Sequence, residues 1–177
     1  KNIIKTNSRL KLKIKYMALS QNCILNSLEI EHKILRMSYQ IYECNINEKE
    51  IILAGILKNG FILAEKIKSN LEKISGIKII LCSIEIDKKN PLNQVKTNIK
   101  HEQYKNKSVV LVDDVLHSGT TLIYGVKHFL DHPLKQFKTA VLVNRNHKKY
   151  PVKADFKGIS LSTSINKHVE VIFSEKK

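Results

Sequence analysis

The chain contains 177 residues, 42% of them hydrophobic, which suits about one globular domain around a single core. Its net charge is +15; residues 1–17 hold six basic and no acidic side chains, so the remaining 160 residues carry +9. No apolar run approaches the roughly 20 residues of a membrane-spanning helix, which excludes a membrane-spanning protein. The basic charge favours binding of polyanions, either a phosphorylated sugar or RNA. AT-rich coding, which enriches lysine, isoleucine and asparagine, also produces such a charge.

Residues 1–16 are rich in lysine and lack both the apolar core of a signal peptide and the composition of a transit peptide. We expect them to be a disordered extension, or to precede a start at Met17. A basic arm that binds RNA is the alternative. No internal repeat or low-complexity tract divides the rest, so we expect one domain over residues 17–177.

The three cysteines lie far apart in the sequence, at Cys23, Cys44 and Cys82. Their odd number and wide spacing match neither a disulfide framework nor a metal site. We therefore expect small buried side chains in a protein of a reducing compartment, the cytoplasm.

Helical and strand patterns alternate along the chain. Asn26 and Glu29 have the spacing of a capping box at the start of the first predicted helix, and Gly76 ends the second. The predicted helices are 27–44, 61–74 and 120–130. The predicted strands are 50–57, 77–86, 108–114 and 138–145, with short β candidates at 154–158 and 168–173. Residues 87–107 are polar and aperiodic and predict a long functional or mobile loop. The alternation indicates an α/β fold with a parallel sheet and right-handed crossovers.

The segment 109–122, VVLVDDVLHSGTTL, has the pattern of a sugar-phosphate site. A buried strand ends in Asp113 and Asp114, and the small residues after it open a helix. Ligands of open α/β sheets bind beyond the carboxyl ends of the strands. Free N–H groups, hydroxyls and the positive end of the helix dipole suit a phosphate there. The two carboxylates can accept hydrogen bonds from a diol or hold hydrated Mg²⁺ through water.

This segment resembles the signature of the type I phosphoribosyltransferases. The resemblance implies their fold, a central, mainly parallel sheet flanked by helices with a small hood. It implies that Asp113 and Asp114 engage the ribose hydroxyls of phosphoribosyl pyrophosphate, with Mg²⁺ held through substrate and water and not directly by the protein. The 5′-phosphate would be bound by the loop Ser118, Gly119, Thr120 and Thr121. A nucleobase nitrogen would attack C1′ of the ribose, and pyrophosphate would leave.

Residues 140–164 resemble the C-terminal part of the pyrimidine-operon attenuation regulator/uracil phosphoribosyltransferase, which has similar Asp-Arg-Gly-His and Ala-Asp-Tyr-x-Gly patterns. Residues 27–65 also align in order, so the resemblance covers about 27–173. It implies nucleotide salvage in the cytoplasm by a homodimer or higher homo-oligomer, with uracil the leading candidate for the base. The alternative is an RNA-binding, nucleotide-sensing regulator of pyrimidine genes with weak or no catalysis.

Two loops differ from that regulator. The loop 55–60 corresponds to its pyrophosphate loop, but Leu57 and Asn59 stand where the regulator has arginines. We expect Lys58, Asn59 and Gly60 to bind pyrophosphate through one cation and backbone N–H groups; a simple strand-to-helix turn is the alternative. Residues 87–91 replace its Leu-Tyr-Arg-Asp-Asp run, which weakens the assignment of uracil. A third hypothesis is therefore a phosphoribosyl-pyrophosphate binder with degraded catalysis.

Three residues are candidates for contact with the base. His117 falls where purine-specific relatives place an aspartate, and its imidazole suits proton transfer to a ring nitrogen; an exposed loop residue is the alternative. Phe156 aligns with an aromatic that stacks on the base in relatives, with core packing as the alternative. Asn144, which precedes Arg145 and replaces the first Asp of the Asp-Arg-Gly-His pattern, can read a ring edge with its amide.

Overall fold

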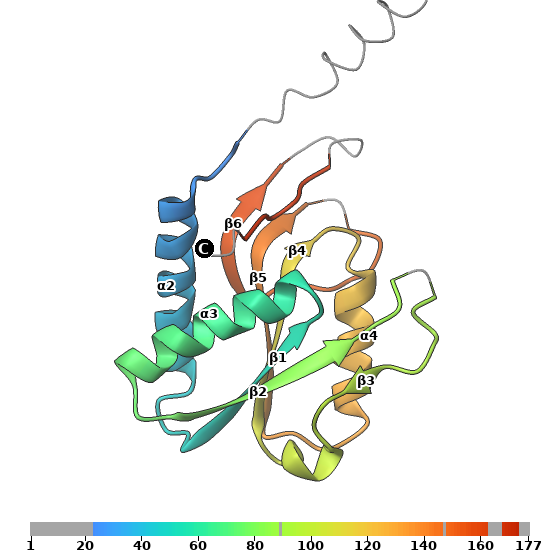
Figure 1. Ribbon diagram of the computed structural model, residues 1–177. Coiled ribbons are helices and arrows are strands. Elements are labelled where there is room, and N and C mark those ends of the chain that lie inside the picture. Colours follow the sequence, from blue (N-terminus) through green and yellow to red (C-terminus); the bar gives the residue numbers. More distant parts are fainter. Residues whose placement is uncertain (1–22, 89, 147, 163–167, 174–177) are drawn as a thin grey trace, which may run out of the picture.

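The computed structural model describes residues 23–88, 90–146, 148–162 and 168–173 (Figure 1). Six strands form one sheet in the order β3-β2-β1-β4-β5-β6. All neighbouring strands are parallel except β2 and β3. The strands are β1 (Glu50–Ile56), β2 (Lys78–Glu85), β3 (Lys96–Thr97), β4 (Ser108–Leu116), β5 (Gln136–Arg145) and β6 (Phe156–Leu161).

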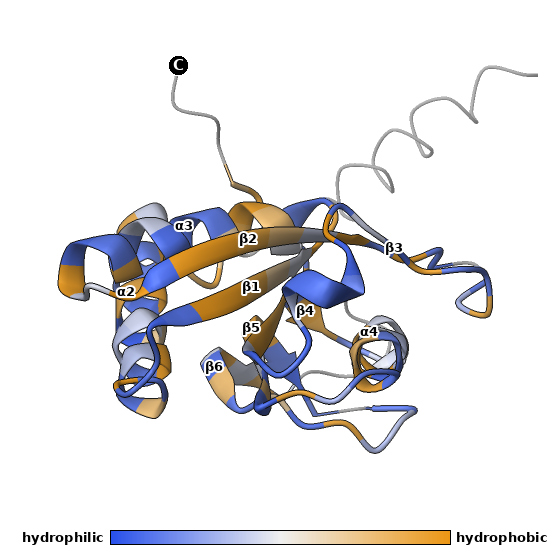
Figure 2. Cartoon of the chain, turned by 90° about the horizontal axis from the view of Figure 1, so that it is seen from below, coloured by the Kyte–Doolittle hydropathy of each residue, from blue (hydrophilic) through white to orange (hydrophobic). Residues whose placement is uncertain are grey.

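Helices cover both faces of this sheet. They are α2 (Ser27–Cys44), α3 (Asn59–Ile74), α4 (Thr120–Leu130) and a short 3-10 helix, η1 (His101–Gln103). The predicted capping box is present at α2, where Asn26 accepts from the Glu29 N–H and Glu29 accepts from the Asn26 N–H. α2 and α3 lie on one face and α4 on the other (Figure 2).

Strands β1 and β4 are buried on both faces, which explains their unbroken apolar sequences. Along β4, Val110 and Val112 pack into the core under α2 and α3. Val109 and Leu111 pack into the second core, under α4. The central strands are thus fixed from both sides, and their carboxyl ends form a rigid edge.

The connections from β1 and β4 leave this edge in opposite directions. β1 leads through α3 to β2 on one side, and β4 leads through α4 to β5 on the other. β1 and β4 are neighbours, paired from Ile51↔Ser108 to Gly55↔Val112. A crevice for ligands opens at such a reversal of strand order, so the fold places the site between the carboxyl ends of β1 and β4.

The predicted α/β architecture is confirmed, with different element ends. α3 begins two residues before the predicted helix, so Asn59 and Gly60 belong to its first turn. β4 continues past the two aspartates because its pairing with β5 extends to Leu116↔Asn144. The predicted loop 87–107 also contains β3 and η1. The β candidate at 168–173 is wrong, since these residues form no strand.

The predictions for the cysteines, for membrane-spanning helices and for the N-terminal extension have different outcomes. Of the cysteines, Cys82 is buried as predicted, whereas Cys23 and Cys44 are exposed; all three are free thiols. Within the described ranges, no helix has both the length and the hydropathy to cross a bilayer. The extension 1–16 and the start at Met17 lie outside the described residues.

Gly55, near the end of β1, allows α3 to approach the strand closely. A Cβ atom there would lie 2.5 Å from Phe61 Cα and 2.9 Å from Gly60 O, both backbone atoms. We expect Gly55→Ala to lower the free energy of unfolding by roughly 1–3 kcal/mol through overpacking. Gly76→Ala is the matched control, because a Cβ there meets nothing within 4 Å. Denaturant titration of both variants checks this, and equal midpoints would contradict it.

Candidate functional site

The two aspartates near the end of β4 lie beside the first turn of α3. Asp113 is 5% exposed and Asp114 is half-buried. A Cβ atom on Gly60 would lie 3.2 Å from Asp113 Oδ1, and Asn59 Nδ2 donates to Asp114 Oδ2 at 3.0 Å. The loop predicted for pyrophosphate is therefore in contact with the acidic pair predicted for ribose.

Asp113 is held mainly in its protonated form at neutral pH. Burial raises its pKa to about 8, and the Asp114 carboxylate adds to the rise. The charge of Lys88 and the Asp114 N–H, which donates to Asp113 Oδ1 at 3.0 Å, act in the opposite direction without cancelling it. The pair thus presents about one negative charge and one neutral carboxyl group, which can accept and donate hydrogen bonds.

The loop after β4 leads into α4. Gly119 has φ +81° at the N-cap, a left-handed conformation that favours glycine. Gly119 at the N-cap makes no side-chain cap, the Thr120 N–H donates to Ser118 Oγ at 3.3 Å, and the first turn has no acidic residue. Ser118 Oγ and Thr120 Oγ1 lie 2.9 Å apart. Uncapped N–H groups, hydroxyls and the helix dipole together suit a dianionic phosphate.

The segment after β5 crosses this loop and supports it. The N–H groups of Lys149 and Tyr150 donate to Ser118 O at 2.8 and 3.2 Å. A Cβ on Gly119 would lie 2.6 Å from Val152 Cγ1. Gly119 is therefore required twice, for its backbone conformation and for the space that Val152 occupies.

The loop after β1 is built in a similar way. Lys58 is exposed, and α3 begins after it without a side-chain cap or an acidic residue in its first turn. The Leu57–Lys58 peptide bond is cis. Leu57 N donates to Ile84 O of β2 at 3.0 Å, which ties the loop to the sheet. α3 and α4 thus both present uncapped N-termini, one on each side of Asp113 and Asp114.

His117 is exposed, and its ring contacts Arg145 of β5, which is 2% exposed. Arg145 Nη1 lies 2.7 Å from His117 Nδ1. Because a guanidinium has only donors, Nδ1 accepts, and the proton of the neutral imidazole lies on Nε2.

The other two base-pocket candidates differ in position. Asn144, near the end of β5, is 6% exposed and donates from Nδ2 to Ser160 Oγ at 3.2 Å. Its Oδ1 is buried and has no hydrogen-bond partner among the described residues. Phe156 pairs with Ala140, four residues before Asn144, and packs into the core under α2 and α3. The structure therefore brings Asn144 to the edge of the site and leaves Phe156 in the core.

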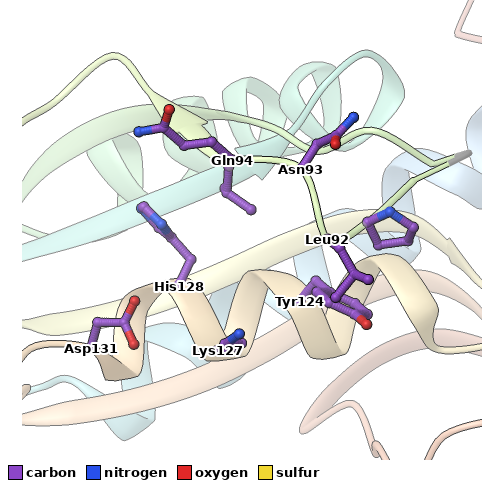
Figure 3. Close-up of a pocket in the computed structure, with 9 residues that line it drawn as sticks. Leu92, Asn93, Gln94, Tyr124, Lys127, His128 and Asp131 are labelled. Carbon is purple, nitrogen blue, oxygen red and sulfur yellow. The ribbon is translucent and has the colours of Figure 1, made fainter.

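A separate hollow lies over α4. It is an open groove of about 370 Å³ between α4 and the residues 91–95 (Figure 3). Tyr124, Lys127, His128 and Asp131 of α4 line one side. Burial lowers the pKa of His128, which favours its neutral form. No residue of the acidic pair or of the phosphate loop lines this groove, so we place the site at the strand ends, where the anion-binding groups converge.

A parallel sheet whose carboxyl edge carries an acidic pair between two uncapped helix N-termini defines an α/β protein for sugar phosphates. The phosphoribosyl transferase domain family matches residues 20–175 of the chain. The chain belongs to this family and is a type I phosphoribosyltransferase, as the resemblance implied. The family's substrates are phosphoribosyl pyrophosphate and a nucleobase.

Known proteins agree with this assignment. The "Bifunctional protein PyrR" of Streptococcus thermophilus (strain CNRZ 1066) is 32% identical over 157 residues, 86% of this chain and 90% of that protein. Its namesake from Fusobacterium nucleatum subsp. nucleatum is 34% identical over 168 residues, 90% and 94% of the two chains. A hypoxanthine-guanine phosphoribosyltransferase structure from Bacillus anthracis has a TM-score of 0.69 at 21% identity and covers 80% of this chain and 82% of its own. That likeness shows the fold alone.

Two features of the site escaped prediction from the sequence. The burial of Arg145 and its contact with His117 depend on how the ends of β4 and β5 meet; the one signal was the position of Arg145 beside Asn144. The carbonyl of Val171 accepts from Asn59 Nδ2 at 2.9 Å. A backbone acceptor leaves no trace in the sequence.

Asp113→Asn should stabilise the protein more at pH 8 than at pH 5. The pKa of Asp113 rises from the ordinary 3.8 to about 8 on folding, so the folded chain binds a proton that the unfolded chain releases, and stability falls as pH rises through this range. Asparagine removes that cost. We expect the Tm gain at pH 8 to exceed the gain at pH 5 by about 10 °C, the effect of roughly 3–4 kcal/mol.

Glu65→Gln, which removes an exposed carboxylate of α3, is the control and should change Tm equally at both pH values. Calorimetry at pH 5 and pH 8 measures both differences. A pH-independent gain for Asp113→Asn would show that this carboxyl has an ordinary pKa.

Proposed function

We propose that this chain transfers ribose 5-phosphate from phosphoribosyl pyrophosphate to an oxo-nucleobase, with uracil as the leading candidate. The observation that carries the proposal is the placement of Asp113 and Asp114 at the reversal of strand order, directly before the loop that opens α4. A diol and a phosphate are the two ends of ribose 5-phosphate, and the two recognition elements are contiguous in the chain.

In this proposal the 5′-phosphate lies against the loop 118–121. Backbone N–H groups of the first turn of α4 and the hydroxyls of Ser118, Thr120 and Thr121 donate to its oxygens. Asp113 and Asp114 bind the ribose hydroxyls. With both ends of the sugar fixed, C1′ is held for attack by the base, and positioning supplies much of the rate enhancement.

The pyrophosphate lies toward α3. Lys58 and the uncapped N–H groups of the first turn of α3 stabilise the charge that develops as the bond from C1′ breaks. Substrate phosphate oxygens and water would hold Mg²⁺ there, with Asp114 accepting from a metal-bound water molecule. Bound in this way, Mg²⁺ would neutralise charge on the leaving pyrophosphate. The chain itself orients the sugar and donates to the leaving oxygens.

The base is read at the ends of β4 and β5. In the neutral tautomer that Arg145 favours, His117 donates from Nε2 to an exocyclic carbonyl oxygen. Asn144 Oδ1 is buried and has no partner among the described residues, and it accepts from a ring N–H once the side chain turns toward the base. An N–H next to a C=O is the edge of uracil and of the 6-oxopurines, whereas cytosine and adenine carry amino groups. Phe156 has no part in this pocket.

A regulator that binds RNA is the second candidate. It is favoured by the +9 charge outside residues 1–17 and by the similarity to relatives named bifunctional. A phosphoribosyl-pyrophosphate binder with weak catalysis is the third, motivated by Leu57 and Asn59 in the pyrophosphate loop.

We also propose a homo-oligomer in the cytoplasm. Leu28, Leu35 and Tyr39 of α2 are exposed at spacings that place them along one side of the helix, an apolar stripe suited to a second copy. The free thiols of Cys23 and Cys44 are exposed, which suits a reducing compartment.

The double substitution Asp113→Asn with Asp114→Asn tests the transferase. We expect it to lower transfer by at least about a thousandfold, roughly 4 kcal/mol of transition-state stabilisation, without any loss of Tm. The measurement is pyrophosphate release from phosphoribosyl pyrophosphate and Mg²⁺ with a panel of bases, in which oxo bases should react and cytosine and adenine should not. The control is the double variant Glu65→Gln with Glu72→Gln, which removes two exposed carboxylates and should catalyse transfer at the wild-type rate. Turnover retained in the aspartate double variant would refute the assignment.

Binding of RNA would show a steep loss of affinity with salt. We expect the chain from Met17 to retain such binding if the domain surface is responsible. If RNA binding is lost when residues 1–16 are removed, the extension is responsible for it. RNA binding that is absent or independent of salt would exclude the RNA-binding regulator. Fluorescence anisotropy with a pyrimidine-rich RNA at several salt concentrations measures this.

A further inference from the structure

We infer that Asn59 is a positioning residue, which fixes Asp114 for the ribose and joins it to the C-terminal segment 168–173, and is not a ligand of the pyrophosphate. This inference rests on the proposed function for the identity of the sugar. It assigns Asn59 a different role from its neighbour Lys58, although both belong to the loop predicted to bind pyrophosphate.

The amide group of Asn59 is fully used by the protein. Its Nδ2 donates to Asp114 Oδ2 at 3.0 Å and to Val171 O at 2.9 Å. A primary amide has two N–H donors, so neither remains for a phosphate oxygen in this arrangement. The partners lie 55 and 112 positions away in the sequence, and Asn59 is the point where the three segments meet.

The carbonyl of Val171 is held firmly enough to orient the amide. Val171 is 6% exposed and belongs to the core under α2 and α3, with Val169 and Phe173 packed at its margin. Lys66 Nζ lies 5.8 Å from the centre of the Phe173 ring, which adds a cation–π contact to α3. The segment 168–173 is thus fixed against α3. Because Asn59 donates to both Val171 O and Asp114 Oδ2, it also holds the Asp114 carboxylate in place relative to this segment.

The bond from Asn59 selects one orientation of the Asp114 carboxylate. Oδ2 accepts from the amide of Asn59, so one oxygen is positioned by the protein while the carboxylate keeps acceptor capacity for a ribose hydroxyl. Without this bond the half-buried carboxylate regains rotamer freedom, and ordering it again costs binding free energy. The pyrophosphate is then left to Lys58 and the N–H groups of α3.

Separate titrations of ribose 5-phosphate and of Mg²⁺–pyrophosphate distinguish the two roles. Asn59→Ala removes a charge-assisted hydrogen bond to Asp114. It should therefore weaken the binding of ribose 5-phosphate about tenfold and the binding of Mg²⁺–pyrophosphate less than about twofold. Lys58→Gln should show the opposite pattern. Asn59→Gln, which keeps both N–H donors, should recover part of the ribose 5-phosphate affinity, and it replaces the alanine variant if that variant does not fold.

Hydrogen exchange of the amides of 168–173 provides a readout independent of the ligand. Asn59→Ala should accelerate exchange there, and Lys58→Gln should leave it unchanged. The inference is overturned if Asn59→Ala weakens pyrophosphate as much as ribose 5-phosphate, or if exchange at 168–173 does not change. Failure of the wild-type chain to bind ribose 5-phosphate would instead overturn the proposed function, and the exchange result would still test the junction.

Discussion

The buried carboxyl of Asp113 is the constraint on which the rest of the site depends. It lies where β1 and β4 send their helices to opposite faces of the sheet, with Gly60 packed against it on one side and the Asp114 carboxylate next to it in the chain. Burying an acid beside another acid costs stability, and the protein meets this cost by keeping Asp113 protonated. Such a group is of little use to folding. Its place at the carboxyl edge of the sheet, where ligands of open α/β sheets bind, fits a functional role, since functional sites are often locally destabilising.

In the proposed site, anion recognition relies on the backbone more than on side-chain charge. Both α3 and α4 begin without a side-chain cap and without an acidic residue in the first turn. In the segment 55–60, Lys58 is the sole charged residue. N–H groups at helix starts are fixed by the fold and need no reorganisation when a phosphate arrives. This explains how a loop with leucine and asparagine at the regulator's arginine positions remains compatible with phosphoribosyl chemistry.

Much of the fold, and the sugar-phosphate half of the site, could be predicted from the sequence. An apolar strand, two acids and a run of small residues follow one another in the segment 109–122, and local patterns report local structure well. The other half depends on long-range geometry. The contact of Asn59 with Asp114 and Val171 joins distant segments, one through a backbone carbonyl. Phe156 follows an Ala-Asp pair, which suggests stacking on the base, yet it pairs with Ala140 and packs in the core. A sequence pattern cannot decide on which side of a sheet edge an aromatic ring lies.

The exposed His117 and the buried Arg145 show the same dependence on packing. Their contact joins the ends of β4 and β5 and determines which nitrogen of the imidazole carries the proton. In the proposed function, the specificity for the base thus depends on a neighbour that does not itself reach the surface. The two halves of the proposed site are built on adjacent strands, which would hold the sugar and the base in a fixed relation.

A crystal structure of the chain with phosphoribosyl pyrophosphate and Mg²⁺ tests the central claim most directly. The account predicts the 5′-phosphate within hydrogen-bonding distance of the N–H groups of 118–121, the ribose hydroxyls on Asp113 and Asp114, and the pyrophosphate beside Lys58. A sugar phosphate bound instead in the groove between α4 and residues 91–95, with the strand ends empty, would contradict it.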